Sequence, residues 1–352
     1  MESAPGDGVT LQINLAPSDL PTAVHTLPHQ LRQLGGQVDE IDLTLDLHRS
    51  GRARFAEEWE ERRPGMNRLL AEIVDRWPSA RVCEVDYSEE ARSAVNHAFL
   101  GGAEVPLKAR GGEALYGYLW AFLEARHDCV LHLDADMMLG GGSQTWVQEA
   151  VRLLDEREDV VFCSPLAGPP TPDGELPDHV VEGIHRWRGV FLGREPESPL
   201  AYRLGHASTR IWLARRSQFL AAVCPLRLLR SPWRKRARAR LDGNPPYENL
   251  EETITEAMLR TGHVRIDYLG EEPGMWSLHP LWRSEEFFDA LPGLIERVEI
   301  GDMPDDQLGD YDVGDSLVDW SSVHAERDLP VSRRARIAWK LKLARALLRR
   351  DP

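Results

Sequence analysis

Short apolar segments alternate with longer amphipathic segments through the first half of the chain, and this alternation limits the folds open to it. The pattern predicts strands at 9–15, 40–46, 80–86, 129–133 and 159–165, and helices at 23–34, 66–77, 113–126 and 144–157. Strands that alternate with helices form parallel βαβ units, so we expect an α/β fold with a mostly parallel central sheet flanked by helices. In such sheets, ligands bind beyond the carboxyl ends of the strands.

The second half of the chain is less regular. Residues 167–245 are rich in Pro, Gly, Trp and Arg, and they predict an irregular insertion with short helices. After the insertion, the spacing of apolar residues predicts a helix at 250–261 and a strand at 263–269. A basic helix is predicted near the end of the sequence, at 332–350.

Composition and charge exclude several classes of protein. The 352 residues carry a formal net charge of −15, and 42% of them are hydrophobic, which suffices for a sizeable core. A protein this acidic is a poor general binder of nucleic acid, so we expect no nucleic-acid partner. The four cysteines include no CxxC pair, and the sequence has neither an export-signal pattern nor an apolar run that could span a bilayer. We therefore expect reduced thiols in a cytoplasmic protein.

The most informative motif is a pair of acids that follows the predicted strand at 129–133. Asp134 and Asp136 are two residues apart, and an extended strand sends such side chains to one face. Two carboxylates on one face form a hard-oxygen site for Mg²⁺ or Mn²⁺, which can bridge nucleotide phosphates and neutralise a departing diphosphate. A solvated loop is the alternative, but the buried strand before the pair and the glycines at 140–142 favour a functional site.

The segment KARGGEALYGYLWAFLEARHDCVLHLDADMML, residues 108–139, resembles the centre of GT-A glycosyltransferases of the family-2 type. There, a basic residue, a helix, a buried strand and a DxD motif follow one another, and residues 9–165 and 247–280 keep this order. The resemblance implies a Rossmann-like GT-A fold and transfer of a sugar from a nucleotide diphosphate sugar, UDP-sugar favoured, to a hydroxyl acceptor, with Mn²⁺ or Mg²⁺ as cofactor.

The resemblance also implies an organisation along the chain. Residues 1–165 would form the nucleotide-sugar-binding half of one GT-A domain, and residues 166–300 its acceptor-binding half. Residues 301–352 would form an acidic linker followed by the basic amphipathic helix.

Donor-side roles follow from the same resemblance. Asp136 resembles the direct metal ligand, and Asp134 resembles the residue that contacts ribose, or the metal through water. Asp46 resembles the carboxylate that binds base or ribose, although a turn or helix-cap role is equally open for it. Asp86 is a weaker candidate for the same nucleotide-binding role.

Basic and aromatic residues complete the expected donor site. Lys108 and Arg110 stand where the family places a cation against the diphosphate, and surface charges on a glycine-flanked loop are the alternative. His279 resembles a further metal ligand, since neutral imidazole suits Mn²⁺, while an ordinary hydrogen-bonded histidine is equally open. Trp276 could stack on a sugar face or belong to the core. His132, inside the strand at 129–133, is expected to be a hydrogen-bonded core residue.

The segment ENLEETITEAMLRTG, residues 248–262, resembles the motif that begins the acceptor-side helix of inverting members. Glu252 occupies the position of the catalytic base and Glu251 precedes it, although the family has Asp at that position. A base there would deprotonate the acceptor hydroxyl as it attacks the anomeric carbon. The structural alternative is that acids favour the first turn of a helix because of its dipole. A retaining GT-A glycosyltransferase, or a GT-A-like binding protein without catalysis, also stays open.

Two basic segments suggest partners. Residues 332–350 carry eight Arg and Lys, and this helix could lie on an anionic membrane surface or dock on acidic segments such as 302–319. Residues 227–240 carry seven Arg and Lys, which could bind an anionic acceptor or a lipid headgroup, or form a solvated surface. We expect a small-molecule, glycan or lipid-linked acceptor, with peripheral contact at the inner face of the membrane through residues 332–350.

Overall fold

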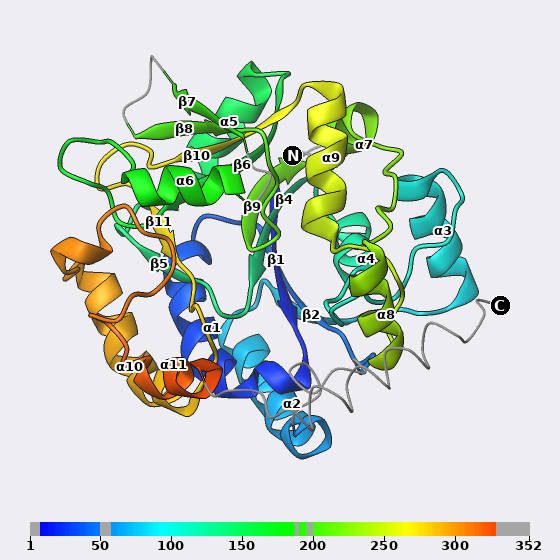
Figure 1. Ribbon diagram of the computed structural model, residues 1–352, viewed down its shortest axis with the longest axis horizontal. Helices are drawn as coiled ribbons and strands as arrows, with labels where there is room; N and C mark the ends of the chain where they lie inside the picture. Colours follow the sequence, from blue (N-terminus) through cyan, green and yellow to red (C-terminus); the bar gives the residue numbers. More distant parts are fainter. Residues whose placement is uncertain (1–7, 50–57, 187–189, 196–199, 329–352) are drawn as a thin grey trace.

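The computed structural model describes residues 8–49, 58–186, 190–195 and 200–328. Figure 1 shows a central sheet with helices packed on both of its faces. The predicted basic helix at 332–350 lies outside the described residues. Within the described residues, no helix combines the length and the apolar character that crossing a bilayer requires.

The first half of the chain builds the parallel part of the sheet, in the order β3-β2-β1-β4. These strands are β1 (Val9–Leu15), β2 (Glu40–Leu45), β3 (Ala80–Glu84) and β4 (Cys129–Asp134). Each lies within two residues of its predicted range. Of the four, β4 is buried along most of its length, as expected for a central strand covered on both faces. The predicted α/β class with a mostly parallel central sheet is therefore confirmed.

The second half of the chain continues the same sheet, in the order β9-β6-β10-β8-β7 beyond β4. These strands are β6 (Val160–Ala167), β7 (Phe191–Arg194), β8 (Ala201–Leu204), β9 (Ile211–Arg215) and β10 (Val264–Tyr268). The segment predicted as an insertion with short helices therefore supplies three strands as well. One of them, β9, runs antiparallel to β4 and to β6.

Helices cover the two faces of the sheet and enclose separate hydrophobic cores. One core includes residues of α1 (Leu20–Leu34), α2 (Trp59–Arg76) and α5 (Trp146–Glu156). The other includes residues of α3 (Glu89–Leu100), α4 (Tyr116–Glu124), α7 (Arg216–Ala222) and α9 (Leu250–Thr261). The remaining helices before α9 are α6 (Asp178–Arg186) and α8 (Trp233–Leu241).

A third core lies beside the main sheet and positions part of the site. It packs α10 (Glu285–Ile300) against β5 (Met138–Gly140) and β11 (Trp276–Leu278). β11 pairs antiparallel with β5 and parallel with β6, so the residues that follow β11 are held close to the end of β4. Trp276 is 4% exposed and is part of this core. Its burial favours the core role over stacking on a sugar face. The short elements η3 (Asp305–Gln307) and α11 (Ser321–Asp328) follow.

Candidate active site

Three neighbouring parallel strands end at the same edge of the sheet, and an acid lies at or just beyond each end. Asp134 is the last residue of β4, Asp46 follows β2, and Asp19 lies in η1 (Pro17–Asp19) after β1. Because β1 lies between β2 and β4, Asp46 and Asp134 are separated by two strand spacings, about 10 Å. This distance suits a ligand that extends from a nucleoside to its phosphates.

Asp46 and Lys108, both predicted from sequence, form a buried pair. The Nζ of Lys108 donates to Oδ2 of Asp46 at 2.7 Å, and the two side chains are 9% and 11% exposed. Oδ1 of Asp46 accepts from the Tyr87 hydroxyl at 2.6 Å and from the backbone N–H of His48 at 2.7 Å.

Asp134 faces α4 on one side and β9 on the other. Its Oδ1 accepts a hydrogen bond from the hydroxyl of Tyr118, whose pKa is raised well above its ordinary value by burial and by the Asp134 charge. Tyr118 therefore stays protonated as a donor. The Oδ2 of Asp134 lies 3.7 Å from Nη1 of Arg210. His132 is the expected hydrogen-bonded core residue, with Nδ1 3.2 Å from Oε1 of Gln12.

Asp136 is 2% exposed and lies in the turn after β4. Arg283 donates to its Oδ2 from Nε at 3.0 Å and from Nη2 at 2.7 Å, and donates to Oδ1 of Asp19 from Nη1 at 2.6 Å. Burial by itself would raise the pKa of Asp136, but the positive charge of the adjacent Arg283 outweighs burial and holds that pKa well below its ordinary value. Among the residues that the structure describes, the buried Oδ1 of Asp136 finds no hydrogen-bond partner.

His279 follows β11 and lies beside Asp136. Its Nε2 lies 3.5 Å from Oδ2 of Asp136 and accepts a hydrogen bond from Nη1 of Arg210. Since arginine can only donate, Nε2 carries the lone pair in this arrangement. Tyr311 stacks on the ring of His279 with centroids 5.9 Å apart, and Nδ1 lies 3.6 Å from Oδ1 of Asp312.

The two glutamates at the start of α9 have different surroundings. The backbone N–H of Thr209 donates to Oε2 of Glu251 at 3.5 Å. Burial raises the pKa of Glu251, and the neighbouring Arg210 only partly opposes this shift. The backbone N–H of Glu252 instead donates to the side chain of Asn249, which caps the helix. Glu251 is therefore the glutamate in electrostatic contact with Arg210, which also interacts with Asp134 and Asp136.

Two predicted residues make contacts away from this cluster. Asp86 is exposed, and its Oδ1 accepts from the backbone N–H of Ser88 at 2.8 Å in a local turn. Arg110 donates to Glu248, which also accepts from Lys235 of α8 at 3.3 Å. In these positions Asp86 and Arg110 support loops at the edge of the site.

Asp136 and His279 offer oxygen and nitrogen atoms of the kind that bind a divalent cation. Their arrangement in this structure is not that of a formed metal site. Asp136 presents a buried oxygen without a partner, and the Nε2 of His279 lies beside the same carboxylate. Yet among the described residues, no group of three or more His, Cys, Asp or Glu side chains is arranged to hold a metal ion. Arg283 and Arg210 lie against the carboxylates of the predicted ligands instead.

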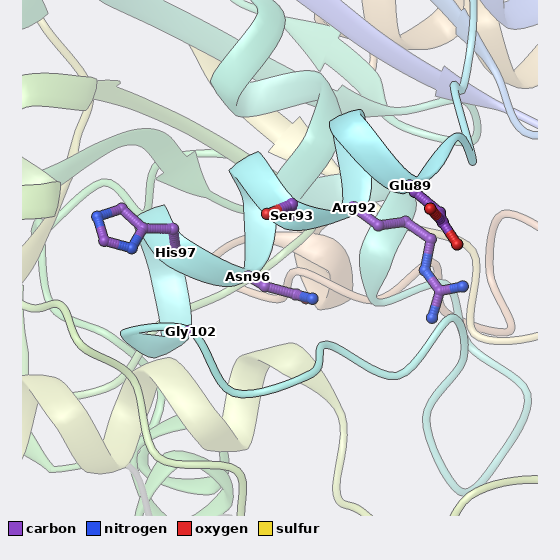
Figure 2. Close-up of a pocket in the computed structure, with 6 residues that line it drawn as sticks. All are labelled: Glu89, Arg92, Ser93, Asn96, His97 and Gly102. Atoms are coloured by element: carbon purple, nitrogen blue, oxygen red, sulfur yellow. The ribbon is translucent and has the colours of Figure 1, made fainter.

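A shallow pocket lies elsewhere on the molecule, on α3. Figure 2 shows its lining residues, which are Glu89, Arg92, Ser93, Asn96, His97 and Gly102. None of the predicted site residues lines it.

Sequence reasoning missed Arg210, Arg283, Tyr118 and Asp19. Asp19 could have been found, since it follows the first strand by only four residues at the ligand-binding edge. The two arginines stand in no motif, and only the pairing of β9 and β11 in the fold brings them to the acids.

Comparisons with known proteins give structural matches alone. No protein-family model matches the sequence, and no curated protein matches it. Glucosyl-3-phosphoglycerate synthase from Mycobacterium tuberculosis, in complex with Mn²⁺, UDP and glucosyl-3-phosphoglycerate, is 13% identical, and the match covers 82% of this chain and 77% of that chain with a TM-score of 0.32. The galactosyltransferase LgtC, in complex with donor and acceptor sugar analogues, is 10% identical over 81% of this chain and 95% of that chain, with a TM-score of 0.36.

A third matched structure is 4-diphosphocytidyl-2C-methyl-D-erythritol synthase from Anaerococcus prevotii, which is 9% identical over 82% of this chain and 98% of that chain, with a TM-score of 0.36. The matched structures thus include a galactosyltransferase.

Proposed function

We propose that this protein transfers a sugar from a nucleotide diphosphate sugar, with UDP-sugar favoured, to a hydroxyl acceptor with inversion. The observation that carries the proposal is the gathering of Asp134, Asp136 and His279 with two arginines at the carboxyl edge of the sheet. Buried acids and fixed cations at this edge suit a ligand whose departing group is a diphosphate.

The donor would lie along the edge from β2 to β4. Asp46, held by Lys108 and Tyr87, would accept hydrogen bonds from the base or ribose. His48 and Tyr87 have ring centroids 5.5 Å apart beside Asp46, which offers apolar surface to a planar base. The diphosphate would then reach the two arginines near Asp134.

Asp136, Asp134 and His279 would hold a Mn²⁺ or Mg²⁺ ion at the end of β4. A bound ion supplies positive charge that neutralises a departing diphosphate. The protein's own part is to place a low-pKa carboxylate and the imidazole Nε2 at this point and to bring Arg210 beside them.

Glu251 would be the catalytic base, in preference to its neighbour Glu252. Burial raises the pKa of Glu251, so its carboxylate is a stronger proton acceptor than an ordinary glutamate. Arg210 lies near both Glu251 and Asp134, so the proposed base lies on the side of the sheet where the donor phosphates would bind. In this role Glu251 takes the proton from the acceptor hydroxyl as it attacks the anomeric carbon.

The acceptor would approach over α8. Five of the nine residues of α8 are Arg or Lys, and Trp233 at its start is 52% exposed. An exposed tryptophan among cations suits an anionic or lipid-linked acceptor at a membrane surface. Lys235 links α8 through Glu248 to Arg110, close to the donor side of the site.

A panel of nucleotide diphosphate sugars, incubated with the full chain, Mn²⁺ and simple glycan or lipid-linked acceptors, tests the proposal. We expect release of a nucleotide diphosphate from one donor, abolished in Asp136→Asn and retained in Asp302→Asn, a matched change at an exposed acid. NMR of the product would show an inverted anomeric centre. If no donor is turned over and none raises the melting temperature with Mn²⁺ present, the proposal is wrong.

A further inference from the structure

Arg283 is held more firmly than a surface arginine. It makes two hydrogen bonds to Oδ2 of Asp136 and one to Asp19, and it thereby joins the loop after β11 to the turns after β1 and β4. The Arg283 side chain is 27% exposed, whereas that of Asp136 is 2% exposed. The guanidinium therefore covers the carboxylate from the solvent side.

This arrangement provides polar neighbours for only one of the two carboxylate oxygens of Asp136. Oδ2 of Asp136 has three neighbouring N–H or imidazole groups, while the buried Oδ1 has no hydrogen-bond partner. A buried carboxylate oxygen without a partner costs free energy unless a ligand satisfies it. The charge of Asp136 is already compensated by Arg283, so a divalent cation at Oδ1 would lie beside a fixed positive charge.

We propose that Arg283 is the resident counter-ion of Asp136, that it competes with the divalent cation for this carboxylate, and that it moves to the donor diphosphate when the cation binds. This inference rests on the proposed function for the nature of the donor. Asp19 is the second anchor of Arg283, so the guanidinium can leave Asp136 while one of its three hydrogen bonds persists. The diphosphate supplies the negative charge that Asp136 gives up.

The competition makes binding of cation and nucleotide mutually dependent. Without nucleotide, a cation must displace a two-bond ion pair, so the free protein binds it weakly. With a nucleoside diphosphate present, Arg283 has a new anionic partner, and the cation gains access to both oxygens of Asp136. By linkage, each ligand tightens the other by the same factor.

Calorimetric titration of Mn²⁺ into the full chain without nucleotide tests the inference directly. We expect Arg283→Gln to bind Mn²⁺ at least about tenfold more tightly than the wild type, because the competitor is gone. Arg283→Lys keeps the charge but cannot form the two-bond clamp, and its affinity should fall between the two. Arg297→Gln is the matched control on α10, where the arginine pairs with Asp302 at the surface, and it should bind like the wild type.

Repeating the titration with UDP adds a second readout. UDP should tighten Mn²⁺ binding in the wild type by a larger factor than in Arg283→Gln. The inference is overturned if Arg283→Gln, folded by circular dichroism, binds Mn²⁺ no more tightly than the wild type, or if Arg283→Lys behaves like Arg297→Gln. Sugar transfer plays no part in these titrations, so an inactive enzyme with the expected Mn²⁺ affinities would refute the proposed function alone.

Discussion

Replacing Asp46 by Asn should destabilise the protein more than replacing Lys108 by Met, although both changes break the same ion pair. In Asp46→Asn, the Lys108 ammonium stays 91% buried without its charge partner, which costs about 3 kcal/mol. In Lys108→Met, the Asp46 carboxylate keeps its bonds from Tyr87 and from the backbone of His48, so the cost is about 1.5 kcal/mol.

The double variant should recover part of this loss. With both charges removed, neither partner is left as a buried ion. The loss of unfolding free energy in the double variant should therefore be about 2 kcal/mol smaller than the sum of the losses in the two single variants. Urea unfolding of the four proteins, with unchanged m-values, measures this coupling. The same cycle at the exposed pair Arg297 and Asp302 should give a coupling below about 0.5 kcal/mol. Additive effects at Asp46 and Lys108 would refute the reasoning, since they would mean that the two groups do not share a buried environment.

Four further outcomes follow from the site and from α8. Glu251→Gln should lower sugar transfer by about 10²–10⁴-fold, whereas Glu256→Gln, at an exposed position of the same helix, should not. The raised pKa of Glu251 should place the acidic limb of the kcat/KM profile above the range of an ordinary glutamate. Because a raised carboxyl pKa favours folding at low pH and this benefit is lost as pH rises through the folded pKa, Glu251→Gln should raise the melting temperature near neutral pH but not in acid. Finally, Arg234→Glu with Arg238→Glu on α8 should weaken co-sedimentation with anionic vesicles at low salt, and unchanged sedimentation would contradict the acceptor-side proposal.

Most of the first half of the fold could be predicted from sequence because its signals are local. The run at β4 and the helix that becomes α9 each carry their full pattern within a dozen residues, and both were found within one residue of their bounds. β9 was missed because a five-residue strand inside a Pro- and Arg-rich region looks like a loop. α10 begins with a capping Ser284 and two acids, a helix-start signal that was present but not used.

The candidate site was predictable only where its residues follow strand ends. Asp46, Asp134 and Asp136 stand at such ends, and the structure brings them to one edge of the sheet. Their counter-ions come from distant segments, so the pairing of Arg283 with Asp136, 147 residues apart, had no local signal. The alternation argument for Asp134 and Asp136 also assumed an extended chain, whereas the structure has a turn after Asp134.

The reversed direction of β9 has a consequence for how such a molecule could diversify. A strand that runs against its neighbours presents its beginning, rather than its end, at the ligand-binding edge, and Arg210 arrives there immediately before Ile211. The backbone N–H of Asp134 donates to the carbonyl of Arg210 at 2.8 Å, which ties this entry point to the acid pair. Loops upstream of β9 can therefore differ in length while Arg210, at the beginning of this strand, stays beside Asp134.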